Sequence, residues 1–420
     1  MRSVEEQLQL MLNSIIAVEP LDLPLLDARG TVLAEDVVAE NPIPAVDMAG
    51  VDGFAVCARE LANASAGSPV SLRIVGRLEA AQAESAGDSS VSVGDLEMPQ
   101  GVAVRVAIGA RIPVGADAVL SASSHPVTTS DGVEWLSVTE QVQSGTGVRG
   151  VGGDVAVGGV VVPEGAAIHE REFAGIVAAG RFRVRVHPHP RVVIVSSGDE
   201  LVEAGQPLGA RQVHDLNATT LVAAAIDAGA QAFRGRPVPD NPDRLAFVVL
   251  DQLIRADLVV VTGRAELVGD RFGGTVFEAL NELGTVRFSS TAVDPGPVIG
   301  FGRVGSASVP IITIPSDPIA ALIAFEVFVR PVIRLLSGRE DLFRPVVRAT
   351  LTRPLRAPMD IRRFVPAVLS LRGTQVSVEP LEDTGSLVGL QQANALAIVE
   401  EGVTDLQPGD RVAVIRLDRG

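Results

Sequence analysis

Three uninterrupted runs of β-branched and aliphatic residues constrain the fold of this chain more than any other feature. The runs are Arg191–Ser196, Asp257–Thr262 and Pro310–Ile314. A strand that is apolar at nearly every position is typical of a parallel sheet covered on both faces. A helix is predicted over Asn217–Ala228, and another begins after Pro318. Strands alternating with helices predict an α/β sheet whose ligands bind at the carboxyl ends of the strands.

The segments on either side of this α/β region have a different pattern. Ser3 and Glu6 form a capping box that predicts an N-terminal helix, and Thr31–Val38 is consistent with helix or strand. Ala80–Ser92 is rich in small polar residues and is predicted to be a loop. Short alternating runs predict an inserted β-rich domain, and short strands between Pro and Gly turns predict a C-terminal β-barrel. The predicted runs and barrel cover residues 71–75, 101–106, 133–138 and 346–417.

Composition excludes several classes of protein. A hydrophobic content of 47% with 20% charged residues is typical of a folded globular chain. The net charge of −16 argues against nucleic-acid binding, which needs a basic surface. The single cysteine, Cys57, rules out an internal disulfide framework, and the first residues lack the apolar core of a secretory signal. We therefore predict a cytoplasmic protein without membrane insertion. The sequence contains no lysine, so arginine supplies every fixed positive side-chain charge.

Several short motifs are spread along nearly the whole chain. They are Asp52-Gly53-Phe54-Ala55-Val56, Gly115-Ala116-Asp117-Ala118-Val119, Ser197-Gly198-Asp199-Glu200-Leu201, Asp215 with Asn217, and Ala393-Asn394. In this order they resemble the bacterial MoeA proteins and the gephyrin E domain. The resemblance implies an elongated α/β fold with four subdomains. These would be a linking subdomain (1–45 and 145–186), an inserted β subdomain (46–144), a molybdopterin-binding-like α/β subdomain (187–338) and the barrel (339–420).

The activity implied by the resemblance is insertion of molybdate into adenylylated molybdopterin, with release of AMP and with Mg²⁺ as cofactor. Its catalytic positions map to Asp52, Asp199 and Glu200. Its cofactor-binding positions map to Arg149, Thr262, Gly263, Asp270, Pro295, Gly296, Pro315 and Asp317, with Glu200 and Asp270 as candidate Mg²⁺ ligands. An alternative for Asp52 and Asp199 is a local role, in which each carboxylate accepts amide hydrogens of its own turn.

Several positions depart from the family pattern. Arg264 replaces the second glycine of the loop after the second strand, and Pro297 replaces the lysine of the Pro-Gly-Lys-Pro motif. Ser316 and Asp317 replace glycine and asparagine in Pro-Gly-Asn-Pro, which places a carboxylate where a phosphate-rich substrate is expected. These losses favour the interpretation that the chemistry is reduced or lost.

Two functional hypotheses remain. The favoured one is a gephyrin-like homodimeric scaffold, without cofactor, that binds the peptide tail of a membrane, cytoskeletal or cell-division protein; Phe364, Val365 and Pro366 are its candidate groove walls. The alternative is an active molybdotransferase in which Arg264 and Arg271 replace the missing lysine on phosphate. The spacing of His187 and His189 also permits metal chelation, although a solvated linker is the preferred interpretation.

Overall fold

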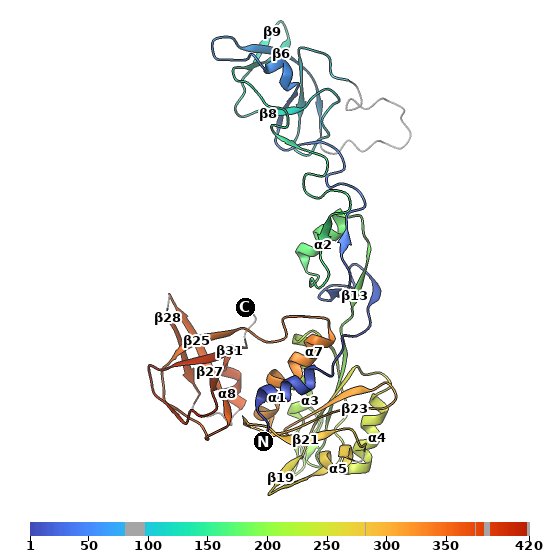
Figure 1. Cartoon of the computed structure of the whole chain (residues 1–420), viewed down its shortest axis with the longest axis vertical. Coiled ribbons are helices and arrows are strands. Elements are labelled where there is room, and N and C mark those ends of the chain that lie inside the picture. Colours follow the sequence, from blue (N-terminus) through green and yellow to red (C-terminus); the bar gives the residue numbers. More distant parts are fainter. Residues whose placement is uncertain (80–96, 282, 374, 382–386, 418–420) are drawn as a thin grey trace. The chain divides into compact units, whose positions relative to one another are not determined.

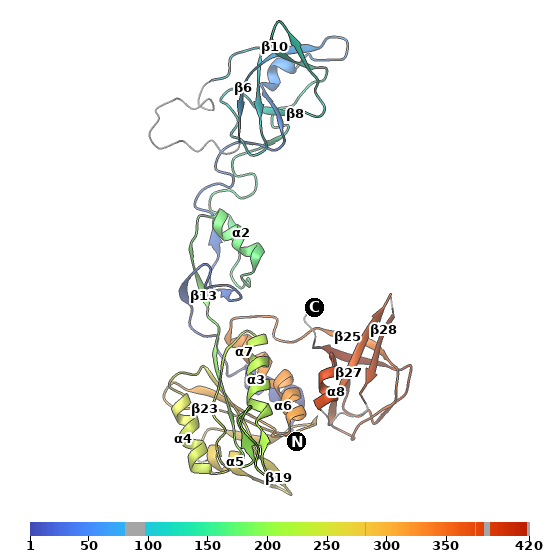
Figure 2. The same ribbon diagram turned by 180° about the vertical axis from the view of Figure 1, so that it is seen from behind.

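The structure is a computed structural model that describes residues 1–79, 97–281, 283–373, 375–381 and 387–417. Its contacts divide the chain into two compact units, which Figures 1 and 2 show from opposite sides. Unit 1 comprises Met1–Glu35, Gly165–His169 and Arg183–Gly420, and unit 2 comprises Asp36–Glu164 and Glu170–Phe182. Each unit has hydrophobic clusters of its own.

A six-stranded sheet lies at the centre of unit 1. Its strand order is β17-β14-β18-β24-β23-β21, and the first four strands are parallel while the last two are antiparallel. The bounds are Gln231–Arg234 (β17), Arg191–Ser196 (β14), Leu258–Thr262 (β18), Val309–Ile314 (β24), Val298–Val304 (β23) and Arg287–Ser290 (β21). The three apolar runs predicted to be buried strands are β14, β18 and β24, so that prediction is confirmed.

Helices cover both faces of this sheet, which explains its uniformly apolar strands. In β14, Val192 and Ile194 pack with one set of helices, whereas Val193 and Val195 pack with the other. All four side chains are fully buried. Such burial contributes about 1.5–3 kcal/mol for each side chain, so a polar residue at any of these positions is costly. The first set is α1 (Val4–Leu12), α3 (Leu216–Asp227), α6 (Pro318–Ala324) and α7 (Arg330–Leu336), and the second is α4 (Pro242–Gln252) and α5 (Thr275–Asn281).

The C-terminal part of unit 1 is a five-stranded β-barrel, as predicted. Strand β27 pairs with both β28 and β29, which closes the ring β27-β28-β25-β31-β29. A short strand from the α/β part, β22 (Val293–Asp294), pairs with β27 and joins the two parts. The barrel strands are Val346–Leu351 (β25), Arg362–Arg372 (β27), Gln375–Pro380 (β28), Ala395–Val399 (β29) and Arg411–Arg416 (β31).

Unit 2 contains a second six-stranded sheet, with order β8-β5-β7-β6-β10-β9. The alternating runs predicted at 71–75, 101–106 and 133–138 are strands β6, β7 and β10, which confirms the β-rich insertion. The bounds are Ala118–Ser121 (β8), Gly53–Val56 (β5), Val102–Val106 (β7), Val70–Leu78 (β6), Val133–Val138 (β10) and Val127–Ser130 (β9). Shorter elements of unit 2 are Val37–Val38 (β3), Met48–Ala49 (β4), Ala58–Leu61 (a 3₁₀ turn), Val148–Arg149 (β11), Val160–Val162 (β12) and Glu170–Ala178 (α2).

Short elements complete unit 1 and settle two local predictions. The capping box of α1 is confirmed, because Ser3 Oγ accepts the Glu6 amide at 3.1 Å and Glu6 Oε2 accepts the Ser3 amide at 3.0 Å. The Thr31–Val38 segment contains two short strands, whereas Ala80–Ser92 lies outside the described residues. The four-subdomain boundaries remain a prediction. The short elements are Leu21–Pro24 (β1), Val32–Leu33 (β2), Arg183–His187 (β13), Leu201–Val202 (β15), Val213–His214 (β16), Glu266–Val268 (β19), Arg271–Gly273 (β20), Phe325–Val329 (a π-helical turn), Leu355–Arg356 (β26), Leu387–Gln392 (α8) and Asp405–Leu406 (β30).

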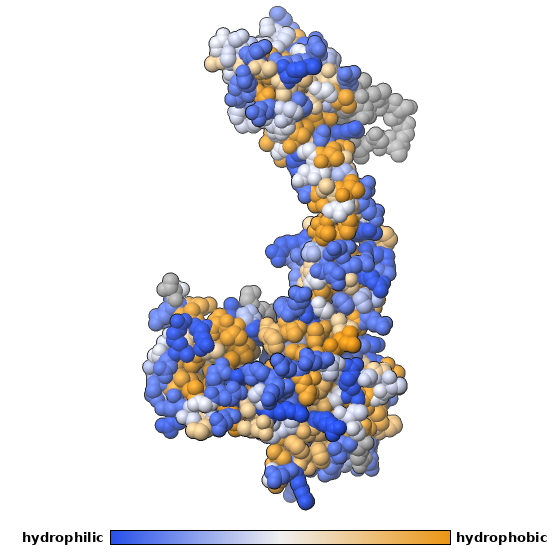
Figure 3. Space-filling view, viewed as in Figure 1, coloured by the Kyte–Doolittle hydropathy of each residue, from blue (hydrophilic) through white to orange (hydrophobic). Residues whose placement is uncertain are grey.

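The surface carries both polar and apolar residues. On the face drawn in Figure 3 the two kinds are interspersed over both units. Singly exposed apolar residues are normal in globular proteins. Within the described residues, no helix combines the length and apolar character needed to cross a membrane.

Candidate functional site

The last residues of three parallel strands lie side by side at one edge of the α/β sheet. The pairing register places Ser196 beside Thr262, and Thr262 beside Ile314. The loops that follow therefore begin at the same edge, which is where open α/β sheets bind ligands. These loops cover residues 197–200, 263–265 and 315–317.

Two side chains join these loops. Thr262 is 1% exposed, and its Oγ1 donates to the carbonyl of Pro315 at 2.7 Å. Asn217, in the first turn of α3, donates from Nδ2 to Thr262 Oγ1 at 3.1 Å and to the carbonyl of Ser316 at 2.7 Å. Both residues thus fix the relative positions of the loops after β18 and β24.

A second buried pair fixes the start of α3. Asp215 Oδ1 caps the helix by accepting the Ala218 amide at 3.0 Å, and it also accepts the hydroxyl of Ser196 at 3.1 Å. Its other oxygen, Oδ2, is buried without a partner, as is the hydroxyl of Ser197. Leaving a buried polar atom unsatisfied costs about 1–3 kcal/mol. These two atoms provide hydrogen-bonding capacity that the described residues do not use.

Asp199 and Glu200 follow directly and are exposed. Asp199 Oδ1 accepts the Asp240 amide at 2.9 Å, which is a contact with a residue 41 positions away and not with its own turn. The carboxylate of Glu200 lies over Gly198, since a Cβ built on that glycine would lie 2.8 Å from both carboxylate oxygens. The edge therefore carries two adjacent carboxylates beside the unsatisfied Ser197 hydroxyl.

Arg264 lies in the loop that follows β18, and its side chain is exposed. Its side chain is 57% exposed, and its Nε lies 3.7 Å from Glu266 Oε1. Strands β19 and β20 form a hairpin directly after it, and Asp270 lies exposed in the turn. Gly263 is tightly packed, because an added Cβ would lie 2.7 Å from Val276 Cγ2. Thus Arg264 presents a guanidinium beside the edge, while Asp270 is carried on the hairpin.

A small cavity of about 190 Å³ lies beside the start of α6. It brings together Pro295, Asp317 and the three candidate groove residues Phe364, Val365 and Pro366, with Asp294 and Arg363 forming an ion pair of 3.0 Å at its wall. Two of the residues predicted for cofactor binding and the three predicted for peptide binding therefore line one cavity.

The loops around this cavity have structural roles. Asp317 caps α6, and its Oδ1 accepts the amides of Ile319 and Ala320 at 3.1 and 2.9 Å. The α6 amides thus partly compensate the negative charge of Asp317. The sequence had suggested that this charge would repel a phosphate. Gly296 has φ +83°, and an added Cβ would lie 2.4 Å from Pro315 Cγ, so only glycine fits there.

Phe364 and Val365 belong to two different cores. Phe364 is 4% exposed and packs in the cluster of the α/β part, whereas Val365 is 2% exposed and packs inside the barrel. Consecutive residues of a strand point to opposite faces, so β27 contributes to both clusters. Burial accounts for these two residues without a bound peptide.

Two further candidates, Asp52 and Arg149, belong to unit 2. Asp52 is exposed, and its Oδ1 accepts the amide of Ile108, which lies 56 positions away and outside its own turn, at 2.9 Å. Arg149 forms an ion pair with Asp154. The adjacent Gly53 lies against Leu120, whose carbonyl oxygen would be 1.8 Å from an added Cβ, so packing alone explains this glycine.

The geometry does not assemble a metal site from protein side chains. His187 Nδ1 lies 2.8 Å from the Val18 carbonyl, and His189 Nδ1 lies 2.7 Å from that of Gly229. Throughout the described parts of the chain, no three His, Cys, Asp or Glu side chains group in a way that could hold a metal ion. Among the described residues, Glu200 and Asp270 thus do not form part of a three-residue metal-binding group.

Comparison with known proteins identifies the family. The MoeA N-terminal region (domain I and II) matches residues 2–180, a probable molybdopterin binding domain matches 193–335, and the MoeA C-terminal region (domain IV) matches 348–417. Molybdopterin molybdenumtransferase 1 of Mycobacterium tuberculosis is 34% identical over 99% of this chain and 98% of its own length. The chain belongs to the MoeA family.

Other relatives agree. Molybdopterin molybdenumtransferase 2 of M. tuberculosis is 32% identical, with 99% of both chains covered. The crystal structure of a MoeA molybdopterin biosynthesis protein from Pyrococcus horikoshii superposes with a TM-score of 0.80 at 25% identity, over 100% of this chain and 99% of that one. The MoeA fold predicted from the sequence motifs is therefore confirmed.

The preferred functional hypothesis is wrong. The sequence favoured a gephyrin-like scaffold and leaned against an enzyme, but full-length relatives in the MoeA family are named as molybdenumtransferases. The comparisons thus support the enzymatic alternative. The error came from treating each lost motif residue as lost chemistry, whereas Asp317, for example, is held as a helix cap in place of the family's asparagine.

Sequence analysis also missed residues that the structure brings to the site. Arg363 lines the cavity beside α6, although it lies 46 positions after Asp317 in the sequence. Asp240 supplies the amide that Asp199 accepts, and its own Oδ1 is buried without a partner. The alternation within β27, which sends neighbouring residues to opposite faces, was the signal available for Arg363.

Proposed function

We propose that this MoeA-family chain inserts molybdenum, supplied as molybdate, into adenylylated molybdopterin with release of AMP. The observation that carries the proposal is the similarity to two M. tuberculosis relatives that bear the name molybdopterin molybdenumtransferase and align over 98% and 99% of their own lengths. The match over the full length supports the proposal, because all three family regions are present in this one chain.

The edge of the α/β sheet supplies the groups for binding the substrate. The unsatisfied hydroxyl of Ser197 is a donor for a phosphate or pterin oxygen, and the exposed carboxylates of Asp199 and Glu200 accept from donor groups of the ligand. Thr262 and Asn217 hold the adjoining loops in place through the bonds described above. In this proposal they are positioning residues and do not contact the reacting atoms.

Arginine takes the place of the lysine that is absent from the sequence. Arg264 is well exposed, and its nearest carboxylate, at 3.7 Å, is too distant for a hydrogen bond. A guanidinium binds a phosphate through two parallel hydrogen bonds, which an ammonium group cannot do. We assign to Arg264 the role of phosphate binding in this chain. The described residues do not provide a protein ligand set for Mg²⁺.

The proposal includes a homodimer, which the family resemblance implies. Sedimentation velocity of the purified chain tests this part independently of the chemistry. A single species of monomer mass at micromolar concentration would remove the dimer from the proposal while leaving the assignment of the substrate intact.

Calorimetric titration with adenylylated molybdopterin tests substrate binding at the sheet edge. Saturable binding by the wild-type protein is expected, with about tenfold or greater weakening in Arg264→Gln, since a charge-assisted contact contributes about 1.5–3 kcal/mol. Arg244→Gln, an exposed arginine on α4, is the matched control and should bind normally. Absence of binding by a folded wild-type protein, or equal weakening in both variants, would contradict the assignment.

A further inference from the structure

A second polar site lies in unit 1, away from the carboxyl edge of the sheet. A cavity of about 820 Å³, here called the arginine cavity, is lined by Arg29, Arg330, Arg334, Arg339, Arg344 and Arg416. It is found where α3 ends and where the chain enters β14, so it lies at the amino ends of the parallel strands. None of the residues assigned to the substrate lines it.

Positive charge is in excess in this cavity. The lining contains six arginines and two carboxylates, those of Asp227 and Asp341, and Glu326 contacts two of the arginines. Guanidinium groups therefore outnumber carboxylates in this lining, in a chain whose net charge is −16. Like charges at close range repel one another, so this concentration is costly unless an anion is present.

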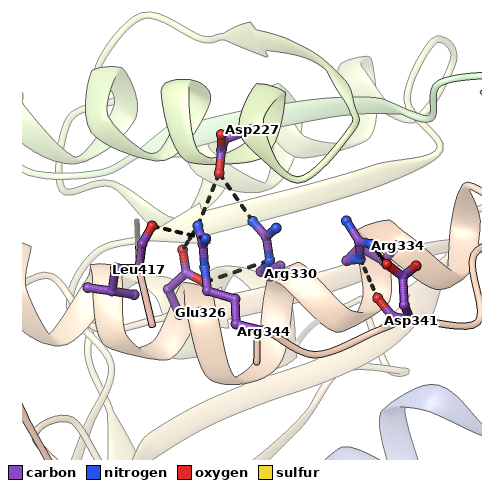
Figure 4. A network of polar contacts seen from close by, with 7 residues as sticks. All are labelled: Asp227, Glu326, Arg330, Arg334, Asp341, Arg344 and Leu417. Atoms are coloured by element: carbon purple, nitrogen blue, oxygen red, sulfur yellow. Dashed lines mark hydrogen bonds and ion pairs between the residues drawn. The ribbon is translucent and has the colours of Figure 1, made fainter. Parts of the chain in front are cut away.

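Two of the arginines are well paired (Figure 4). Arg344 bonds Glu326 through Nε at 2.6 Å and Asp227 through Nη2 at 3.0 Å, and it also donates to the Leu417 carbonyl at 3.0 Å. Arg334 bonds both the carboxylate and the backbone carbonyl of Asp341.

A third arginine, Arg330, is poorly compensated. Arg330 is 7% exposed, yet its carboxylate contacts are long, at 3.5 Å to Asp227 and 3.8 Å to Glu326, and its Nε has no hydrogen-bond partner. Burial lowers the pKa of Arg330; Glu326 opposes this effect, while the charges of Arg344 and Arg334 reinforce it.

Arg339 and Arg29 also have guanidinium nitrogens available for a ligand. Arg339 donates from Nη2 to the Gly30 carbonyl at 3.0 Å, while its Nε is buried without a partner. Burial lowers the pKa of Arg339, and the charge of Arg334 acts in the same direction. Arg29 is exposed beside Gly30, so its guanidinium can reach into the cavity mouth.

We propose that the arginine cavity binds a doubly charged tetrahedral oxyanion through Arg330, Arg339 and Arg29. Guanidinium groups match the geometry of such an anion and bind it bidentately. The volume exceeds that of one oxyanion, so it accommodates the ligand as free phosphate, sulfate or molybdate and also as the phosphate of an ester. The site is separate from the substrate edge and acts as a second ligand site of this chain.

The test is calorimetric titration of the full-length protein, in a chloride buffer free of oxyanions, with inorganic phosphate, molybdate and AMP in separate arms. Saturable binding of at least one of these is expected, and Arg339→Gln and Arg29→Gln should each weaken it by about tenfold. Both variants keep the well-paired Arg344 and Arg334, so circular dichroism should show a native fold. Tighter binding of AMP than of phosphate identifies an ester as the ligand, and the reverse identifies a free oxyanion; either result supports the proposal.

Two controls separate this site from the substrate edge. Arg244→Gln, on the other face of the sheet, should bind the anions as the wild type does. Arg264→Gln, at the opposite edge, weakens only binding at the substrate edge, so the binding that is lost in Arg339→Gln should persist in it. No saturable binding in any arm, or equal weakening by Arg244→Gln, would overturn the proposal. It would also be overturned if no oxyanion bound and Arg339→Gln altered the sedimentation coefficient, since protein groups of a second copy would then occupy the cavity.

Discussion

Thr262→Val is the sharpest test of how the substrate edge is held together. The substitution keeps the β-branched shape of a side chain that is 1% exposed, but removes a hydroxyl that donates to Pro315 and accepts from Asn217. One lost hydrogen bond contributes about 1 kcal/mol, and the Pro315 carbonyl left without its donor adds about 1–3 kcal/mol. The free energy of unfolding of unit 1 should therefore fall by about 2–4 kcal/mol.

Urea denaturation followed by far-ultraviolet circular dichroism measures this loss, and the chain supplies an internal reference. The only tryptophan, Trp135, lies in β10 of unit 2, so its fluorescence transition should be unchanged. Thr219→Val, on the exposed face of α3, is the matched control and should change stability by less than about 0.5 kcal/mol. A loss below about 0.5 kcal/mol in Thr262→Val would refute the claim that this hydroxyl joins the two loops.

Three other substitutions test separate parts of unit 1. Gly296→Ala should destabilise by more than about 1 kcal/mol in thermal or urea unfolding, because φ is +83° and the added Cβ would lie 2.4 Å from a proline ring; Gly273→Ala, with open space around it, should cost far less. Phe364→Ala should cost about 3–5 kcal/mol by loss of core packing, whereas Phe247→Ala, which is exposed, should stay within about 0.5 kcal/mol. Arg344→Met should cost about 3–5 kcal/mol, because it leaves buried carboxylates without their main partner; unchanged unfolding would contradict the network in Figure 4.

The α/β core was predictable because its signal is local. Strands β14 and β18 are apolar at almost every position, and that pattern has few alternatives once Gly and polar residues bound it. The capping box at Ser3 is likewise contained in four residues. The family motifs then placed the β-rich insertion and the barrel in order along the chain.

The state of the substrate edge was harder to predict, because it depends on which atoms each side chain contacts. Asp317 looked electrostatically unfavourable in the sequence, but its carboxylate accepts two amides of α6. Arg264 and Pro297 show that a glycine and a lysine of the family motifs are missing. A single sequence does not show which other groups take over the roles of these two residues. The scaffold hypothesis rested on those losses, and the full-length relatives overturned it.

The arginine cavity could not be predicted at all, because its residues are distant in sequence. Arg29 precedes Arg330 by 301 positions, and Asp227 reaches Arg344 across 117. No short motif connects them, and only the folding of α3 against α7 and the following linker brings them together.

Molybdate-dependent release of AMP tests the central claim most directly. The purified full-length chain would be mixed with adenylylated molybdopterin, and AMP measured by chromatography before and after molybdate is added. The account predicts AMP release that depends on molybdate, is reduced at least tenfold in Glu200→Gln, and is unchanged in Glu278→Gln, an exposed glutamate on α5. No AMP release from folded wild-type protein that binds the substrate would contradict the proposed molybdotransferase activity.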